Sequence, residues 1–102
     1  MKTKPFSLEL SDEAEVDFNK SYKFYYEDSP KVAETYFKQI NIAFENVKQN
    51  PESFPVVRKN VRKYVVKKFP FVIYYQIVDT VIQVIAIFHT SRNPEIWNER
   101  IF

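Results

Sequence analysis

Residues 69–97 read FPFVIYYQIVDTVIQVIAIFHTSRNPEIW, and this stretch decides the fold. Apolar side chains dominate its first two runs on both alternating faces, which is typical of strands in the middle of a sheet. Residues that share a face are Phe69, Phe71, Ile73, Tyr75 and Ile77 in the first run, and Ile82, Val84, Ala86 and Phe88 in the second. The break between the runs is Asp79-Thr80, so we predict a tight antiparallel hairpin of strands 69–78 and 81–89 near the sheet centre.

Two amphipathic helices are predicted before this hairpin. Ser11 is a candidate N-cap for the first helix. The apolar stripe of that helix comprises Ala14, Phe18, Ser21, Tyr22 and Tyr25. The acidic residues after the cap are Asp12, Glu13, Glu15 and Asp17. We interpret these carboxylates as a solvated turn that matches the helix dipole, because they lie too close in sequence to converge on a metal.

The second helix is predicted from Pro30 to about Gln49, with Ser29 as its cap and Asn50-Pro51 as its end. A short strand is predicted at 5–10, a loop at 51–60 and a third strand at 61–68. One or two helical turns are predicted at 94–100, from which Ile96 and Trp97 are available to pack back on the domain. The order β-α-α-β-β-β indicates an α+β fold, in which a two-helix hairpin packs on one face of a mostly antiparallel sheet.

Composition narrows the classes of function. At 102 residues, with 45% apolar side chains, the chain is predicted to form a single domain. It contains no cysteine, which excludes disulfides and thiolate sites and fits a reducing cytoplasm. It contains no glycine, which excludes glycine-rich phosphate loops. We predict no signal peptide from the N-terminal residues, and the sequence holds no apolar run of about 20 residues, so we expect no membrane partner. We also expect no cofactor and no metal.

Charge is distributed unevenly along the chain. Residues 1–52 hold seven lysines and ten acidic residues, whereas residues 53–102 hold eight basic and three acidic residues. The basic residues of an acid-free run, 53–78, are Arg58, Lys59, Arg62, Lys63, Lys67 and Lys68. Such a run favours an acidic partner or a nucleic acid, and it is equally typical of a solvated strand edge protected by lysines.

Several stretches, taken in this order, resemble the RelE/ParE superfamily of bacterial toxins from type II toxin–antitoxin modules. They are the Ala14–Phe18–Tyr22–Tyr25 helix, the Ala33–Phe37–Ile40 helix, Asn50-Pro51, Arg62, FPFVIYY at 69–75 and IAIFHTSRNPEIW at 85–97. The resemblance implies a cytoplasmic growth inhibitor of the plasmid-stabilisation type, silenced by a cognate antitoxin. It leaves two targets open, because RelE-like members cut messenger RNA on the ribosome and ParE-like members act on DNA gyrase.

If the chain is a nuclease, the candidate catalytic residues are His89, Arg92 and Arg62. Metal-free RNA cleavage needs a proton carrier and cations for the phosphorane charge. Histidine can carry the proton near neutral pH, and two guanidinium groups can brace the phosphate. Structural roles are the alternatives: a strand-end imidazole bonded to the backbone, an ion pair of Arg92 with Glu95 or Glu99, and an edge-strand charge at Arg62.

The C-terminal residues favour the ParE-like branch. RelE-like nucleases carry a tyrosine near the C-terminus, whereas this chain has none after Tyr75 and instead has a His-x-x-Arg-Asn tail. Gyrase is therefore the preferred target; a ribosome-dependent mRNA endonuclease and an inactive antitoxin-binding module are the alternatives. The residues predicted to bind the target or partner are Arg58, Lys59, Arg62, Lys63, Lys67, Lys68, Arg92 and Trp97, the last of which is otherwise a packing residue.

Overall fold

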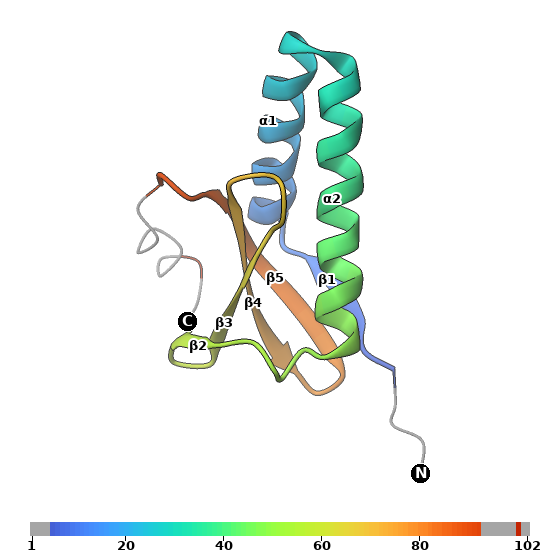
Figure 1. Ribbon diagram of the computed structural model, residues 1–102. Helices are drawn as coiled ribbons and strands as arrows, with labels where there is room; N and C mark the ends of the chain where they lie inside the picture. The colour runs from blue at the N-terminus through green and yellow to red at the C-terminus, as the bar shows by residue number, and fades with distance from the viewer. Residues whose placement is uncertain (1–4, 93–99, 101–102) are drawn as a thin grey trace.

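The computed structural model describes residues 5–92 and Arg100. Its elements are β1 (Ser7–Leu10), α1 (Asp12–Asp28), α2 (Pro30–Gln49), β2 (Val56–Arg58), β3 (Val61–Val65), β4 (Phe71–Val78) and β5 (Val81–His89). The five strands form one sheet in the order β1-β5-β4-β3-β2, with β1 parallel to β5 and the other pairs antiparallel. The helices lie side by side on one face of this sheet (Figure 1), which confirms the predicted α+β fold. The predicted turns at 94–100, apart from Arg100, lie outside the described residues.

Both helices begin where the capping residues predict. The Ser11 hydroxyl accepts a hydrogen bond from the Ala14 N–H at 3.0 Å, and the Ser29 hydroxyl accepts one from Val32 at 3.4 Å. Pro30 occupies the first turn of α2, where its missing N–H costs nothing. Among the described residues, no helix combines the length and apolar character needed to cross a membrane.

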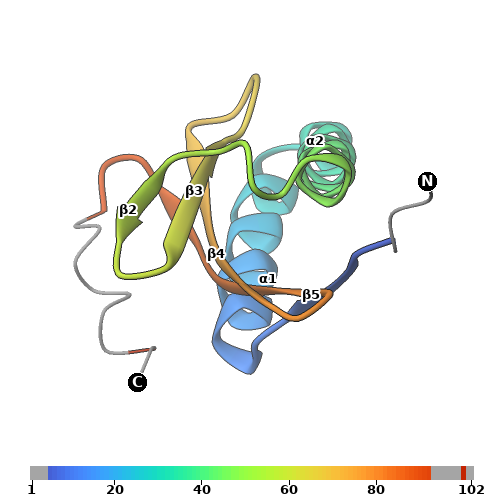
Figure 2. The ribbon, with the colours of Figure 1, turned by 90° about the horizontal axis from the view of Figure 1, so that it is seen from below.

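Four strand assignments differ from the prediction. Two differences are small, since β1 begins at Ser7 instead of residue 5 and β4 begins at Phe71 instead of residue 69. The predicted loop 51–60 contains the three-residue edge strand β2, whose side chains are all exposed and therefore show no apolar alternation. Figure 2 shows β2 at the edge of the sheet, away from α2. The third strand ends at Val65 instead of 68, because the chain turns through Lys68 at a φ of 73°.

Ile82, Val84, Ala86 and Phe88 were predicted to share one face of β5, and this prediction is wrong beyond Val84. The β4–β5 register pairs Tyr74 with Ala86 but Tyr75 with Val84, so Ile85 is an extra residue in a β-bulge. Ile82, Val84 and Ile87 therefore pack in the core under the helices, whereas Ile85, Ala86 and Phe88 pack in a second cluster. On β4, the prediction is confirmed, since Phe71, Ile73 and Tyr75 all belong to the core under the helices.

Aromatic rings join the helices to the sheet. Tyr36 of α2 has no exposed surface, and its ring centroid lies 5.1 Å from that of Tyr25, 5.2 Å from that of Phe71 and 5.5 Å from that of Phe69. Burial raises the pKa of Tyr36 to about 12. This packing fixes α1 and α2 over β4, and so it fixes which α1 side chains reach β5.

Candidate functional site

The clearest polar site of the described residues is centred on Asp17. Its side chain points from α1 to β5 and is 5% exposed. Oδ2 accepts the Ile87 N–H at 3.0 Å and the Arg100 Nη1 at 2.7 Å, while Oδ1 accepts the Arg100 Nη2 at 3.2 Å. The prediction that Asp17 belongs to a solvated acidic turn is therefore wrong. Asp17 follows Ala14 by three residues, which places it on the buried stripe of α1.

The Asp17 site lies at an edge of β5 with which no strand of residues 5–92 pairs. The β1 register reaches only from Val81 to Val84 of β5. Beyond it, the Ser11 N–H donates to the Val84 carbonyl at 3.0 Å, and the Arg100 Nη1 donates to the Ile85 carbonyl at 3.0 Å. The Ile87 N–H donates to the Asp17 carboxylate in the same way. These hydrogen bonds satisfy backbone groups of β5 that would otherwise be free to pair with a strand of another molecule.

Two guanidinium groups share this site with an aromatic ring. The Arg92 Cζ lies 4.1 Å and the Arg100 Cζ 4.9 Å from the centroid of the Phe88 ring, within cation–π range. The Arg92 Nη1 also lies 3.7 Å from the Asp17 Oδ1. The predicted alternative partners of Arg92, Glu95 and Glu99, lie outside the described residues.

His89 ends β5 with its ring on the local backbone. Its Nδ1 accepts the Ser91 N–H at 3.0 Å and lies 2.8 Å from the Ser91 Oγ, and its ring packs edge-on to Phe71 with centroids 5.3 Å apart. A neutral imidazole that accepts at Nδ1 carries its proton on Nε2. This backbone-bonded arrangement is the structural role predicted for His89 as the alternative to catalysis.

Arg62 contacts a loop at a distance from the strand end. Its Nη1 donates to the Glu52 carbonyl at 2.9 Å and to the Phe54 carbonyl at 2.7 Å. In the sheet, Arg62 pairs with Tyr75, whereas His89 pairs with Phe71, four residues along β4. This offset is about 13 Å along the strand. The structure therefore does not bring Arg62 together with His89 and Arg92.

The other predicted partner-binding cations gather around β2 and β3. Arg58, Lys59, Lys63, Lys67 and Lys68 are exposed or half-buried. None of them forms an ion pair within residues 5–92 and Arg100. Trp97, the remaining predicted contact residue, lies outside the described residues. The role of all these side chains in binding stays a prediction.

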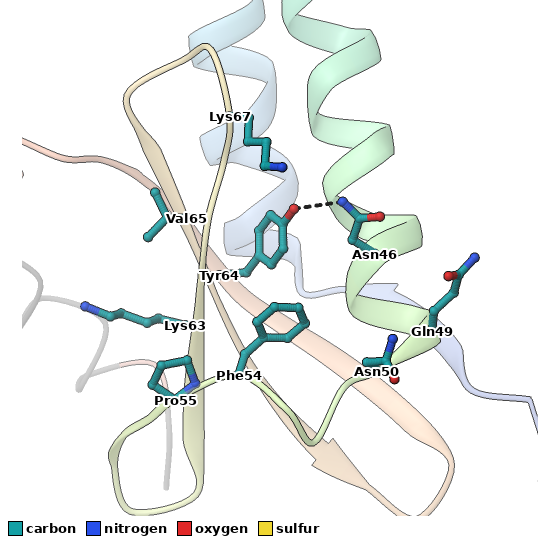
Figure 3. A pocket seen from close by; sticks show the side chains of 9 residues that line it. All are labelled: Asn46, Gln49, Asn50, Phe54, Pro55, Lys63, Tyr64, Val65 and Lys67. Carbon is teal, nitrogen blue, oxygen red and sulfur yellow. Dashed lines mark hydrogen bonds between the residues drawn. The ribbon is translucent and has the colours of Figure 1, made fainter.

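A groove of about 520 Å³ opens between the C-terminal end of α2 and β3 (Figure 3). Its lining residues are Asn46, Gln49, Asn50, Phe54, Pro55, Lys63, Tyr64, Val65 and Lys67. The Asn46 Nδ2 donates to the Tyr64 Oη at 2.8 Å, and the Phe54 ring packs edge-on to Tyr64 with centroids 5.0 Å apart. We call this feature the α2–β3 groove.

Comparison with known proteins assigns the family. The family model for the ParE toxin of the type II toxin–antitoxin system parDE matches residues 8–94. The chain belongs to the ParE toxin family. No curated protein matches it.

Solved structures support the same fold for this ParE-family chain. A chain of the chromosomal ParDE toxin–antitoxin system from P. aeruginosa aligns with a TM-score of 0.73 and 20% identity, covering 82% of this chain and 95% of that one. A chain of the RelBE2 toxin–antitoxin complex from Mycobacterium tuberculosis aligns with a TM-score of 0.57 and 16% identity, covering 84% and 99%. The predicted RelE/ParE fold is thus confirmed, and neither likeness selects a target.

Sequence reasoning missed two members of the site of this ParE-family toxin. Asp17 carried one usable signal, since an acidic residue on an otherwise apolar helical stripe needs a buried partner. Arg100 carried no comparable signal, because its pairing spans 83 positions in sequence. Within residues 5–92 and Arg100, no group of three or more histidine or acidic side chains is placed to hold a metal ion.

Proposed function

We propose that this ParE-family toxin inhibits growth by binding to DNA gyrase, that it does not cut RNA, and that a cognate antitoxin silences it. One observation is the main support for gyrase, and not messenger RNA, as the target. The three side chains best suited to RNA chemistry are engaged in separate structural contacts: His89 with Ser91, Arg92 with Asp17, and Arg62 with the 52–54 loop.

RNA cleavage without a metal requires these functions in one place. A base must take the proton of the 2′-hydroxyl, an acid must protonate the leaving oxygen, and cations must lie near the developing phosphorane charge. The Arg92 guanidinium lies beside the buried carboxylate of Asp17, and this negative charge offsets part of the positive charge of Arg92. Arg62 lies some four residues along the sheet from His89. This separation supports a binding mechanism.

Two features of the sequence support the same choice. The tail has the ParE-like pattern from His89 to Asn93, and no tyrosine follows Tyr75. Gyrase works on DNA inside the cell, so the proposal places the toxin in the cytoplasm. The proposal also assigns a role to the exposed cations of the β2–β3 region, which is to attract an acidic antitoxin.

The test measures both activities side by side. The wild type and the variants His89→Gln, Arg92→Ala and Lys38→Ala are expressed without antitoxin at equal levels. Primer extension on translated RNA then reports cleavage, and a supercoiling assay reports gyrase function. We expect impaired supercoiling, an induced DNA-damage response and uncut messages for the wild type. Arg92→Ala should weaken toxicity, whereas His89→Gln and the exposed control Lys38→Ala should leave it unchanged.

Two results would contradict the gyrase proposal. Cuts within codons that disappear in His89→Gln, with supercoiling intact, would identify a ribosome-dependent nuclease, because removing a proton carrier costs about 10²–10⁴-fold in rate. No effect in either assay would identify an inactive antitoxin-binding module.

A further inference from the structure

The two outer strands of the sheet differ in how well they are protected against pairing. β2 is three residues long, follows Pro55 and runs into the exposed cations Arg58 and Lys59. Proline and cations at an edge strand discourage pairing, because proline lacks a donor and two such edges repel each other. β1 is four residues long, and Glu9 is its one charged side chain. β1 is therefore the outer strand better suited to pair with another strand.

The outward backbone groups of β1 are free to pair. The Ser7 N–H donates inward, to the Thr80 carbonyl at 3.0 Å. Successive residues of a strand direct their backbone groups to opposite sides, so those of Leu8 and Leu10 point away from β5. Within the described part of the chain, no hydrogen bond reaches these outward groups. The sheet can therefore be extended at this edge without breaking a bond.

A depression of about 800 Å³ lies beside this edge, where Pro5 and Phe6 meet the C-terminal end of α2 (Figure 1). Its charged residues are Glu45, Lys48 and Glu52, and the Lys48 Nζ lies 3.4 Å from the Glu45 Oε2. A surface that meets a copy of itself must avoid a strong field of one sign, because like charges would then face each other. The mixed and partly paired charges of this depression meet that condition, whereas the cations around β2 do not.

We propose that β1 pairs antiparallel with β1 of a second copy of this chain, about a two-fold axis at Leu8, to form a weak dimer. In this register Leu8 faces the partner's Leu8, Phe6 faces the partner's Leu10, and Ser7 faces the partner's Glu9. The first two kinds of pair exchange backbone hydrogen bonds, because their backbone groups point outward. The dimer joins the two sheets into one and leaves both basic β2 edges at its ends.

Charge selects this register. A shift of two residues would place Glu9 directly opposite the partner's Glu9, at a Cα separation of about 4.5 Å where like charges destabilise the pair. With Leu8 on the axis, the Ser7 hydroxyl is instead placed to donate to the partner's Glu9 carboxylate. Phe6, Leu8 and Leu10 are half-buried at the margin of the core, so the same register joins the apolar layers of the two copies.

The first measurement is sedimentation of the full-length toxin over a range of concentrations. A strand edge of this length buries less surface than the roughly 1,600 Å² of a standard interface, so we expect a monomer at low concentration and a dimer as the concentration rises.

The register is tested by cysteine pairing, since the chain has no cysteine of its own. Ser7→Cys and Glu9→Cys are purified separately, mixed and mildly oxidised. The two positions face each other at about 4.5 Å between Cα atoms, which is within disulfide range. We therefore expect a disulfide between unlike variants. Each variant alone should stay unlinked, because its cysteines are diagonal neighbours about 7–8 Å apart. Exposed Lys38→Cys, mixed with Glu9→Cys, gives the level of random linkage.

Charge variants test the facing of Ser7 and Glu9 without cysteine. Ser7→Glu should weaken dimerisation by about fivefold, because two copies of a repulsive pair form, and Ser7→Lys should strengthen it by a similar factor. Both substitutions are at an exposed position, so the fold should be retained. The matched controls are Val57→Glu and Val57→Lys on exposed β2, which change the net charge equally and should leave dimerisation almost unchanged.

Four outcomes would overturn the proposal: a monomer at every concentration, linkage of Glu9→Cys with itself as fast as with Ser7→Cys, equal effects of the Ser7 and Val57 variants, or a monomer whose Glu9→Cys links to the antitoxin instead. None of these outcomes depends on the target of the toxin. A toxin that leaves supercoiling intact but still dimerises through β1 would contradict the proposed function and leave this proposal standing.

Discussion

The carboxylate of Asp17 and the guanidinium of Arg100 form a two-pronged ion pair, with oxygen–nitrogen distances of 2.7 and 3.2 Å across 83 positions of sequence. The side chains are 5% and 11% exposed. Each partner also binds the backbone of β5, Asp17 at the Ile87 N–H and Arg100 at the Ile85 carbonyl. The pair therefore closes the strand edge and holds Arg100 against α1.

Removing one partner of this pair should be costly. Asp17→Asn leaves the Arg100 guanidinium without a compensating charge in a buried site, and we expect a loss of about 3 kcal/mol in the free energy of unfolding. The double variant Asp17→Asn/Arg100→Met should recover part of this loss, because it removes the stranded charge. Urea titration of the four proteins in the cycle measures the coupling.

Glu13 provides the control for this cycle. Its Oε2 lies 3.8 Å from the Arg100 Nε, but its side chain is 59% exposed. Glu13→Gln should change the stability by less than about 1 kcal/mol, since exposed pairs contribute little. Equal effects of Glu13→Gln and Asp17→Asn would show that burial does not govern this site.

Stability should fall in alkaline solution because of two buried tyrosines. Burial raises the pKa of Tyr75 to about 12, an effect that the nearby Arg62 partly offsets, and burial raises that of Tyr36 to about 12 as well. An unfolded tyrosine has a pKa of about 10. Between these values the unfolded chain releases protons that the folded chain keeps, so the stability present below pH 10 is lost progressively up to about pH 12.

Tyr75→Phe tests this origin. The variant should lose about 1 kcal/mol at neutral pH, because the hydroxyl no longer donates to the Pro51 carbonyl at 2.7 Å. Its stability should then decline less steeply than that of the wild type above pH 10. The exposed Tyr26 supplies the control variant, Tyr26→Phe, and tyrosinate absorbance follows the titration. Identical alkaline slopes in the wild type and Tyr75→Phe would contradict the assignment.

The turn at Lys68 should improve when glycine replaces lysine. Lys68 has a φ of 73°, in the left-handed region where a Cβ costs about 1 kcal/mol. Lys68→Gly should therefore be about 0.5–1 kcal/mol more stable than Lys68→Ala, which removes the same charge but keeps the Cβ. Thermal unfolding of the two variants gives the comparison, and a less stable glycine variant would refute the strain argument.

Arg62 should act as a structural brace. Arg62→Gln removes the donors to the carbonyls of Glu52 and Phe54 and should cost about 1–3 kcal/mol. Arg58→Gln, at an exposed position of β2, should stay within about 0.5 kcal/mol of the wild type. Urea unfolding measures both. A stable Arg62→Gln toxin that has lost activity would instead return Arg62 to the candidate functional residues.

Local features of this chain were predictable from sequence. The caps at Ser11 and Ser29, the end of α2 at Gln49 and the turn at Asp79-Thr80 depend on residues within a few positions of one another. Their physics is short-range, so sequence neighbours suffice to predict it. The α+β class followed as well, because a two-helix hairpin and apolar strands leave few ways to bury their apolar faces.

The tertiary structure decided the rest. A bulge at Ile85 reverses the facing of β5, and β2 forms only because β3 offers it an edge. Asp17 was predicted to be solvated, but the packing of α1 on β5 buries its carboxylate. Its burial is tolerated because Arg100, 83 positions away in sequence, supplies the opposite charge. Sequence spacing determined which side chains could share a face, but only the packed sheet and helices determined which buried charges met their partners.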